Sequence, residues 1–128
     1  MSTDIDVLLI EDNLSDAQLF QDLLISSEIM QVKLYHAERF EAAVKALEDK
    51  NKFDVVLLDL CLPDGEGIAL VKHIKTMLPK VPVIVLSGIQ DQNVALAALK
   101  EGAQDYLVKA DTFSPDRLAR LGYVDVGN

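Results

Sequence analysis

The sequence has very little cysteine: Cys61 is the only one among 128 residues. A single cysteine excludes a disulfide bond within the chain, and with it the small secreted folds that disulfides hold together. The expected environment is therefore the reducing cytoplasm.

The sequence also lacks a long apolar run. The stretch VPVIVL at residues 81–86 is far shorter than the roughly 20 apolar residues that a helix needs to cross a bilayer. The first residues, MSTDIDVLLIEDN, have neither the basic start nor the small-residue cleavage site of a signal peptide. We therefore expect a cytoplasmic protein without a membrane partner.

Basic residues are scarce as well. The 12 Lys and Arg residues stand against 21 Asp and Glu residues, which gives a formal net charge of −9. Direct binding to nucleic acid is not expected, because it needs a basic surface that neutralises phosphates. The acidic balance suits a cation site or a protein partner with a basic face. Half of the residues are hydrophobic, and the length fits one globular domain with a single core.

Apolar runs and helical patterns alternate along the chain. Nearly continuous apolar runs predict five buried strands, at residues 5–10, 32–37, 53–58, 83–86 and 105–109. Residues 13–16 offer capping side chains for a first helix, in which apolar residues recur at helical spacing at Leu19, Phe20, Leu23 and Leu24. Further helices are expected at residues 39–49, 68–77, 90–101 and 116–121, with Gly102 as a helix C-cap. The pattern predicts an α/β fold with a parallel sheet covered by helices on both faces.

Carboxylates follow two of these strands: Glu11 and Asp12 follow the first, and Asp59 follows the third. In a parallel sheet the carboxyl ends of the strands lie on one edge, where ligands bind. Three carboxylates held close together repel each other, and a divalent cation removes that penalty. Their hard oxygen ligands favour Mg²⁺, Mn²⁺ or Ca²⁺ over Zn²⁺.

The same edge carries groups that suit an anion. Lys109 supplies a positive charge, Ser87 a hydroxyl donor, and Gly88 a backbone that a ligand can approach closely. These groups fit a phosphoryl group carried on an aspartate. Asp59 is therefore the candidate nucleophile, with a metal ion and Lys109 compensating the developing charge.

The set of motifs VLLIEDN, VVLLDLCLPDGEG, VIVLSG and GAQDYLVK resembles the receiver domain of bacterial two-component response regulators. The resemblance covers residues from about 4 to 121, with a tail at 122–128. It implies a flavodoxin-like (βα)5 fold, a three-layer sandwich whose five-stranded parallel sheet has the order 2-1-3-4-5. Residues 1–128 would form a single receiver domain, either a stand-alone protein or a fragment of a larger response regulator or hybrid kinase.

The resemblance also implies roles for particular residues. Asp59 would accept a phosphoryl group from a histidine kinase or a histidine phosphotransfer protein, and Ser87 and Lys109 would contact that group. A magnesium ion, or manganese in its place, would be held by Glu11, Asp12, Asp59 and the backbone carbonyl of Cys61. Ser87 and Tyr106 would form the switch that changes binding to a downstream output domain or protein, with a homodimer as a further possibility.

Two features depart from the family pattern, and two further positions bear on how long a phosphoryl group would last. Lys109 is followed by Ala110 where proline with a cis bond is common, and a non-proline cis bond costs about 3–4 kcal/mol. The last predicted helix has only about two turns before Gly122. Cys61 and Ile89 stand at two positions that tune hydrolysis in the family, and neither side chain positions water well, so we expect slow autodephosphorylation.

Two other classes of protein fit the sequence less well. A haloacid-dehalogenase phosphatase needs a second acid where this chain has Cys61, and a flavodoxin would bring its flavin phosphate against Glu11 and Asp12. The sequence has neither a P-loop nor a GxGxxG pattern. The expected protein is thus a signalling phospho-acceptor rather than an enzyme, and the main alternative is a pseudo-receiver that binds partners without being phosphorylated.

Overall fold

The computed structural model describes residues 4–25, 31–48, 52–60, 67–88 and 91–109. The described strands are β1 (Asp4–Ile10), β2 (Gln31–Ala37), β3 (Val55–Asp59), β4 (Val83–Ser87) and β5 (Asp105–Val108). The described helices are α1 (Leu14–Ile25), α2 (Phe40–Leu47), α3 (Gly67–Met77) and α4 (Gln92–Lys100). Within these ranges, no helix has the length and apolar character needed to cross a membrane.

The five strands form one parallel sheet in the order β2-β1-β3-β4-β5. The order confirms the expected 2-1-3-4-5 arrangement, and the alternation of strands and helices confirms the α/β class. Every residue of β3 and β4 is buried, which explains why these two strands read as uninterrupted apolar runs. Because they lie in the middle of the sheet, both of their faces are covered.

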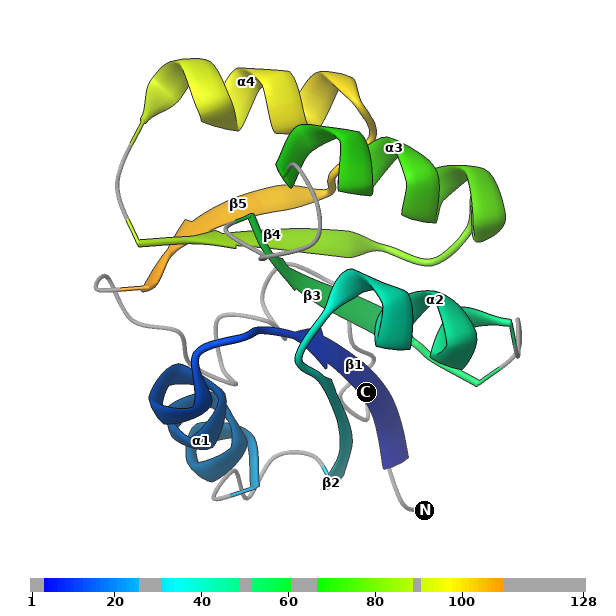
Figure 1. The fold of residues 1–128 in the computed structure, drawn as a ribbon, viewed down its shortest axis with the longest axis vertical. Helices are drawn as coiled ribbons and strands as arrows, with labels where there is room; N and C mark the ends of the chain where they lie inside the picture. The colour runs from blue at the N-terminus through cyan, green and yellow to red at the C-terminus, as the bar shows by residue number, and fades with distance from the viewer. Residues whose placement is uncertain (1–3, 26–30, 49–51, 61–66, 89–90, 110–128) are drawn as a thin grey trace, which may run out of the picture.

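The described helices lie on both faces of the sheet (Figure 1). Helices α2, α3 and α4 lie on one face, and α1 lies on the other. The core on the first face includes Ala43 of α2, Ile74 of α3 and Ala98 of α4. The core on the second face includes Phe20 of α1, whereas Leu19, its neighbour in the predicted apolar pattern, is exposed. The described part of the chain is therefore a three-layer sandwich.

Several boundaries differ from the sequence prediction. Strands β3 and β4 extend to Asp59 and Ser87, so both polar residues belong to the sheet itself. Helix α4 begins at Gln92 and not at residue 90, because Asp91 is an extended N-cap whose side chain accepts from the backbone N–H groups of Asn93 and Val94. The Cys61 carbonyl, Ile89, the Lys109–Ala110 peptide, the tail and the predicted helix at residues 116–121 lie outside the described residues.

Helix α4 ends at Lys100 with Glu101 as its C-cap, so Gly102, the predicted cap, is the first residue after it. The φ angle of Gly102 is +107°, a conformation that residues with a side chain rarely adopt. Its backbone N–H donates to the carbonyl of Leu99 at 3.1 Å. The stem of Lys75 lies beside it, and the ammonium of Lys75 donates to the carbonyls of Pro79 (3.0 Å) and Val81 (2.8 Å). Lys75 thus holds the turn after α3 against the end of α4.

Replacing Gly102 with alanine will destabilise the fold by about 1–3 kcal/mol, because the new Cβ must accept a positive φ. That Cβ would also lie 3.2 Å from the Cγ of Lys75. Urea denaturation measures the change. The matched control is Gly88→Ala, since no atom lies within 4 Å of a Cβ there, and its effect will stay within about 0.5 kcal/mol. Equal stability of the two variants would contradict the prediction.

Candidate functional site

The sheet register gathers the predicted site residues at one edge. Ile10 pairs with Leu58, Asp59 pairs with Leu86, and Ser87 pairs with Val108. Glu11 follows β1 and Lys109 follows β5, so both lie at the edge where β3 ends in Asp59 and β4 ends in Ser87. This is the edge at which parallel sheets bind ligands.

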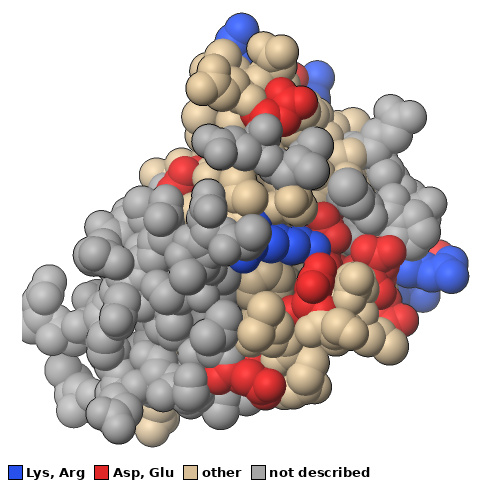
Figure 2. Space-filling view, turned by 90° about the vertical axis from the view of Figure 1, so that its left-hand side faces the viewer, with Lys and Arg blue, Asp and Glu red and all other residues tan. Residues whose placement is uncertain are grey.

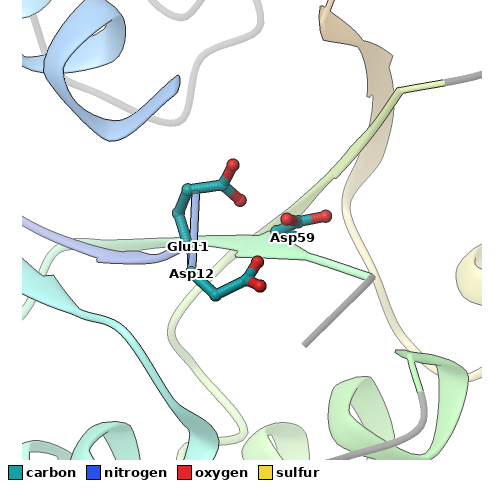
Figure 3. A group of neighbouring side chains, drawn as sticks. All are labelled: Glu11, Asp12 and Asp59. Atoms are coloured by element: carbon teal, nitrogen blue, oxygen red, sulfur yellow. The ribbon is translucent and has the colours of Figure 1, made fainter. Parts of the chain in front are cut away.

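Three carboxylates meet at this edge and point toward one another (Figure 3). Glu11, Asp12 and Asp59 each offer an oxygen, and the three oxygens lie within 4.8 Å of one another. Glu11 and Asp59 are buried, whereas Asp12 is exposed. The sequence predicted this cluster, and it opens to solvent on the Asp12 side.

Glu11 is fixed through its backbone. Its N–H donates to the carbonyl of Ala37 at 2.9 Å, which continues the pairing of β1 with β2. Its carbonyl accepts a hydrogen bond from Nε2 of His36 at 2.6 Å, so His36 carries its proton on that nitrogen. The side chain is wholly buried, and its Oε2 atom has no hydrogen-bond partner. Burial raises the pKa of Glu11 to about 9, with the carboxyl of Asp59 adding to the effect and Lys109 opposing it.

Lys109 joins the acidic residues. Its Nζ donates to Oε1 of Glu11 at 2.6 Å, to Oδ2 of Asp16 at 2.9 Å and to Oδ2 of Asp59 at 3.3 Å. Its side chain is only 18% exposed. Burial alone would lower the pKa of Lys109, but the hydrogen bonds to Glu11 and Asp16 and the charges of Asp59 and Glu11 together raise it. The ammonium is therefore a fixed positive charge beside the buried Asp59.

Asp16 is the site residue that sequence reasoning missed, because it was interpreted only as part of a helix start. It lies in the first turn of α1, where its backbone N–H donates to Oδ1 of Asn13 at 3.0 Å. The hydrogen bond to Lys109 lowers the pKa of its carboxyl. The available signal was position: a helix that begins directly after β1 places its first turn over the strand ends.

Ser87 lies at the end of β4, and Tyr106 lies on β5, the neighbouring strand. Ser87 is the buried last residue of β4, next to the strand end that carries Asp59. Tyr106 on β5 pairs with Val85, is half-buried, and packs against the core beneath α2, α3 and α4. The hydroxyl that was predicted to face the site thus stands at the correct edge, and Tyr106 stands on the helix-covered face.

The residues at this edge fit a divalent cation. Figure 2 shows acidic side chains gathered on one face of the molecule around a basic side chain. Among the described residues, four carboxylates, those of Glu11, Asp12, Asp16 and Asp59, have a single ammonium near them, that of Lys109. The unpartnered Oε2 of Glu11 is a buried oxygen that either a proton or a cation would satisfy. Clustered carboxylate oxygens are the ligands that Mg²⁺, Mn²⁺ and Ca²⁺ prefer.

Comparison with known proteins identifies a family model and several relatives that match this chain. The family model described as "Response regulator receiver domain" matches residues 7–121. The transcriptional regulatory protein ZraR of Salmonella typhimurium is 33% identical over 114 residues, which are 89% of this chain and 24% of ZraR. The chain thus spans about a quarter of the length of that relative.

Two solved structures share the fold closely. A response regulator receiver domain protein from Clostridium thermocellum has a TM-score of 0.79 and 28% identity, covering 92% of this chain and 91% of that one. A response regulator from Burkholderia pseudomallei, with a phosphorylated aspartic acid, a calcium ion and citrate, has a TM-score of 0.78 and 27% identity. That match covers 92% of this chain and 66% of the other.

The raised pKa of Glu11 makes stability depend on pH in the absence of divalent cations. The folded state holds a proton that the unfolded state has lost between the ordinary carboxyl pKa of 4.5 and about 9. The free energy of unfolding should therefore fall as pH rises through this window, by at most about 1.4 kcal/mol per pH unit from this group.

Urea denaturation in a chelator, repeated from pH 5 to 9, measures this slope. In Glu11→Gln the neutral side chain has no proton to lose, so the curve should be flatter than in the wild type. The control Glu48→Gln changes an exposed carboxyl at the end of α2 and should keep the wild-type slope. Identical curves for the wild type and Glu11→Gln would refute the assignment to Glu11.

Proposed function

Because this chain belongs to the response regulator receiver domain family, we propose that it is a phospho-accepting receiver in which Asp59 takes up the phosphoryl group. One observation carries the proposal: the buried Asp59 carboxylate belongs to a cluster suited to a cation and also accepts a hydrogen bond from the ammonium of Lys109. A phosphoryl group on Asp59 would place negative charge next to both the proposed cation and the ammonium of Lys109. The phosphorylated aspartic acid of the Burkholderia pseudomallei relative supports this assignment.

Magnesium is the proposed cofactor, and manganese would serve in the same place. Glu11, Asp12 and Asp59 would hold it, with the carbonyl of Cys61 as a further ligand. When bound, the cation withdraws charge from the phosphoryl oxygens. The calcium ion in the Burkholderia pseudomallei relative is consistent with a hard cation in this family.

The chemical step is a transfer between nucleophiles. An oxygen of Asp59 attacks the phosphorus of a phosphohistidine, the new P–O bond forms, and the P–N bond breaks with its electron pair left on the imidazole. Lys109 would donate a hydrogen bond to a phosphoryl oxygen, for which it lies in reach at 3.3 Å from Asp59. Ser87, at the end of the neighbouring strand, would donate another.

Ser87 and Tyr106 form the proposed switch. A hydrogen bond from Ser87 to the new phosphoryl group would favour one of two arrangements of the β4 end. Tyr106 on β5 pairs with Val85, which lies on β4 with Ser87, and it packs against the core beneath α2, α3 and α4. A shift of β4 would therefore reach the side chain of Tyr106. The outcome would be a changed surface around α4 and β5.

The proposed partners follow from the role. A histidine kinase or histidine phosphotransfer protein would supply the phosphoryl group in the cytoplasm, and a downstream output domain or protein, or a second copy of the chain, would receive the signal. Neither direct binding to nucleic acid nor a membrane partner is proposed for this domain. Residues 1–128 would act as one receiver domain, alone or within a longer protein.

Intact-mass spectrometry after incubation with acetyl phosphate tests the proposal. The wild type should gain one phosphoryl group only when Mg²⁺ is present, and Asp59→Asn should gain none. The matched control is Asp54→Asn, which removes an exposed carboxylate just before the same strand and should label like the wild type.

The outcomes separate two functions. Equal labelling of Asp59→Asn and the wild type would reject Asp59 as the acceptor. No labelling of the wild type under any condition would favour a pseudo-receiver that acts without phosphorylation.

A further inference from the structure

The ammonium of Lys109 has three N–H groups, and three carboxylates accept from them. Two of the three, Glu11 and Asp59, belong to the cluster that could hold a cation. The third, Asp16, does not. Lys109 therefore contacts two of the three carboxylates that would hold a metal ion.

A cation entering the cluster would place a second positive charge beside the ammonium of Lys109 and would weaken its hydrogen bonds to Glu11 and Asp59. The side chain of Lys109 is mostly buried, so an ammonium that lost all its acceptors would be left in a poorly solvated place. Leaving a buried charge unpaired is strongly unfavourable. The ammonium then needs an acceptor within reach that the metal ion does not take.

Asp16 meets this requirement. Its Oδ2 is 2.9 Å from the Nζ of Lys109, closer than the Oδ2 of Asp59 at 3.3 Å. The first turn of α1 fixes its backbone, because Asn13 accepts from its N–H and the following residue, Ala17, is buried in the core. The side chain of Asp16 is 37% exposed, so it can follow a small movement of the ammonium.

We propose that Asp16 is a positioning residue that keeps Lys109 paired while Mg²⁺ takes Glu11 and Asp59, and that it thereby strengthens Mg²⁺ binding. The inference rests on the proposed function, since it concerns the same site. Asp16 would act through Lys109 and would not itself be a metal ligand.

A simpler explanation would give the same sign for one variant. Any negative charge near the site attracts Mg²⁺, so removing Asp16 could weaken binding without involving Lys109. The two explanations differ when Lys109 is replaced. If Asp16 acts through the lysine, its removal has no effect once the lysine is absent, whereas a plain charge effect persists.

The experiment measures Mg²⁺ affinity by isothermal titration calorimetry, using the full chain and Mg²⁺ alone. Asp16→Asn should bind Mg²⁺ about two- to fivefold more weakly than the wild type, the range for a partly exposed charge pair. Asp16→Glu should keep most of the affinity. The control Asp22→Asn removes a charge from the same helix, where Asp22 accepts from Gln18, and should change the affinity by less than about twofold.

The second part places Asp16→Asn in a Lys109→Met background. Lys109→Met should bind Mg²⁺ more tightly than the wild type, because the competing ammonium is gone, and adding Asp16→Asn should then change the affinity by less than about twofold. Circular dichroism checks that each variant folds. If Asp16→Asn does not fold, Asp16→Ser carries the same test, because serine is favoured near helix starts.

Each outcome decides the inference. Weaker binding in Asp16→Asn that disappears without Lys109 supports it. Unchanged binding in Asp16→Asn overturns it, as does weaker binding that persists without Lys109. If the wild type itself binds no Mg²⁺, the metal site of the proposed function fails, and this inference fails with it. Only that last result, no Mg²⁺ binding by the wild type, would also contradict the proposed function.

Discussion

The contact of Lys109 with three carboxylates is the interaction on which the site depends. It joins residues 98 positions apart in the chain, from the end of β1 to the end of β5, across the two central strands. Glu11 and Asp59 are both buried, and their carboxylate oxygens lie within 4.8 Å of each other. Two negative charges this close repel strongly in a poorly solvated place. The ammonium of Lys109 offsets part of this repulsion. The ammonium does not balance all of the negative charge at the site. The raised pKa of Glu11 and its unpartnered Oε2 are consistent with this excess.

The fold holds this arrangement by backbone pairing and not by side-chain packing alone. Glu11 is bonded to β2 through both its N–H and its carbonyl, and Asp59 is the last paired residue of a fully buried strand. Helix α1 begins three residues after Glu11, so its first turn brings Asp16 to the same edge. Groups fixed in this way need little rearrangement when a ligand arrives, which is how a site is made ready for chemistry.

Much of this could be predicted because the strongest signals in the sequence are local. The strands at the centre of a parallel sheet are covered on both faces, so they appear as uninterrupted apolar runs, and the residues that follow them must meet at one edge. Boundaries were less well predicted. Asp59 and Ser87 are polar, yet both continue their strands, because a ladder partner can satisfy their backbone whatever the side chain. Helix α4 starts late because the side chain of Asp91 caps it, and a capping residue is itself not helical.

The sequence by itself determined the fold class, the strand order through its family resemblance, and the identity of the groups at the strand ends. Only the tertiary structure decided that Glu11 is wholly buried with one oxygen unpartnered, that His36 anchors its backbone, and that Asp16 shares the ammonium of Lys109. The physical reason is the range of the forces involved. Hydrophobic periodicity and turn chemistry act between residues close in sequence, whereas the burial of a charge and the choice of its partner depend on how separate elements are placed in space.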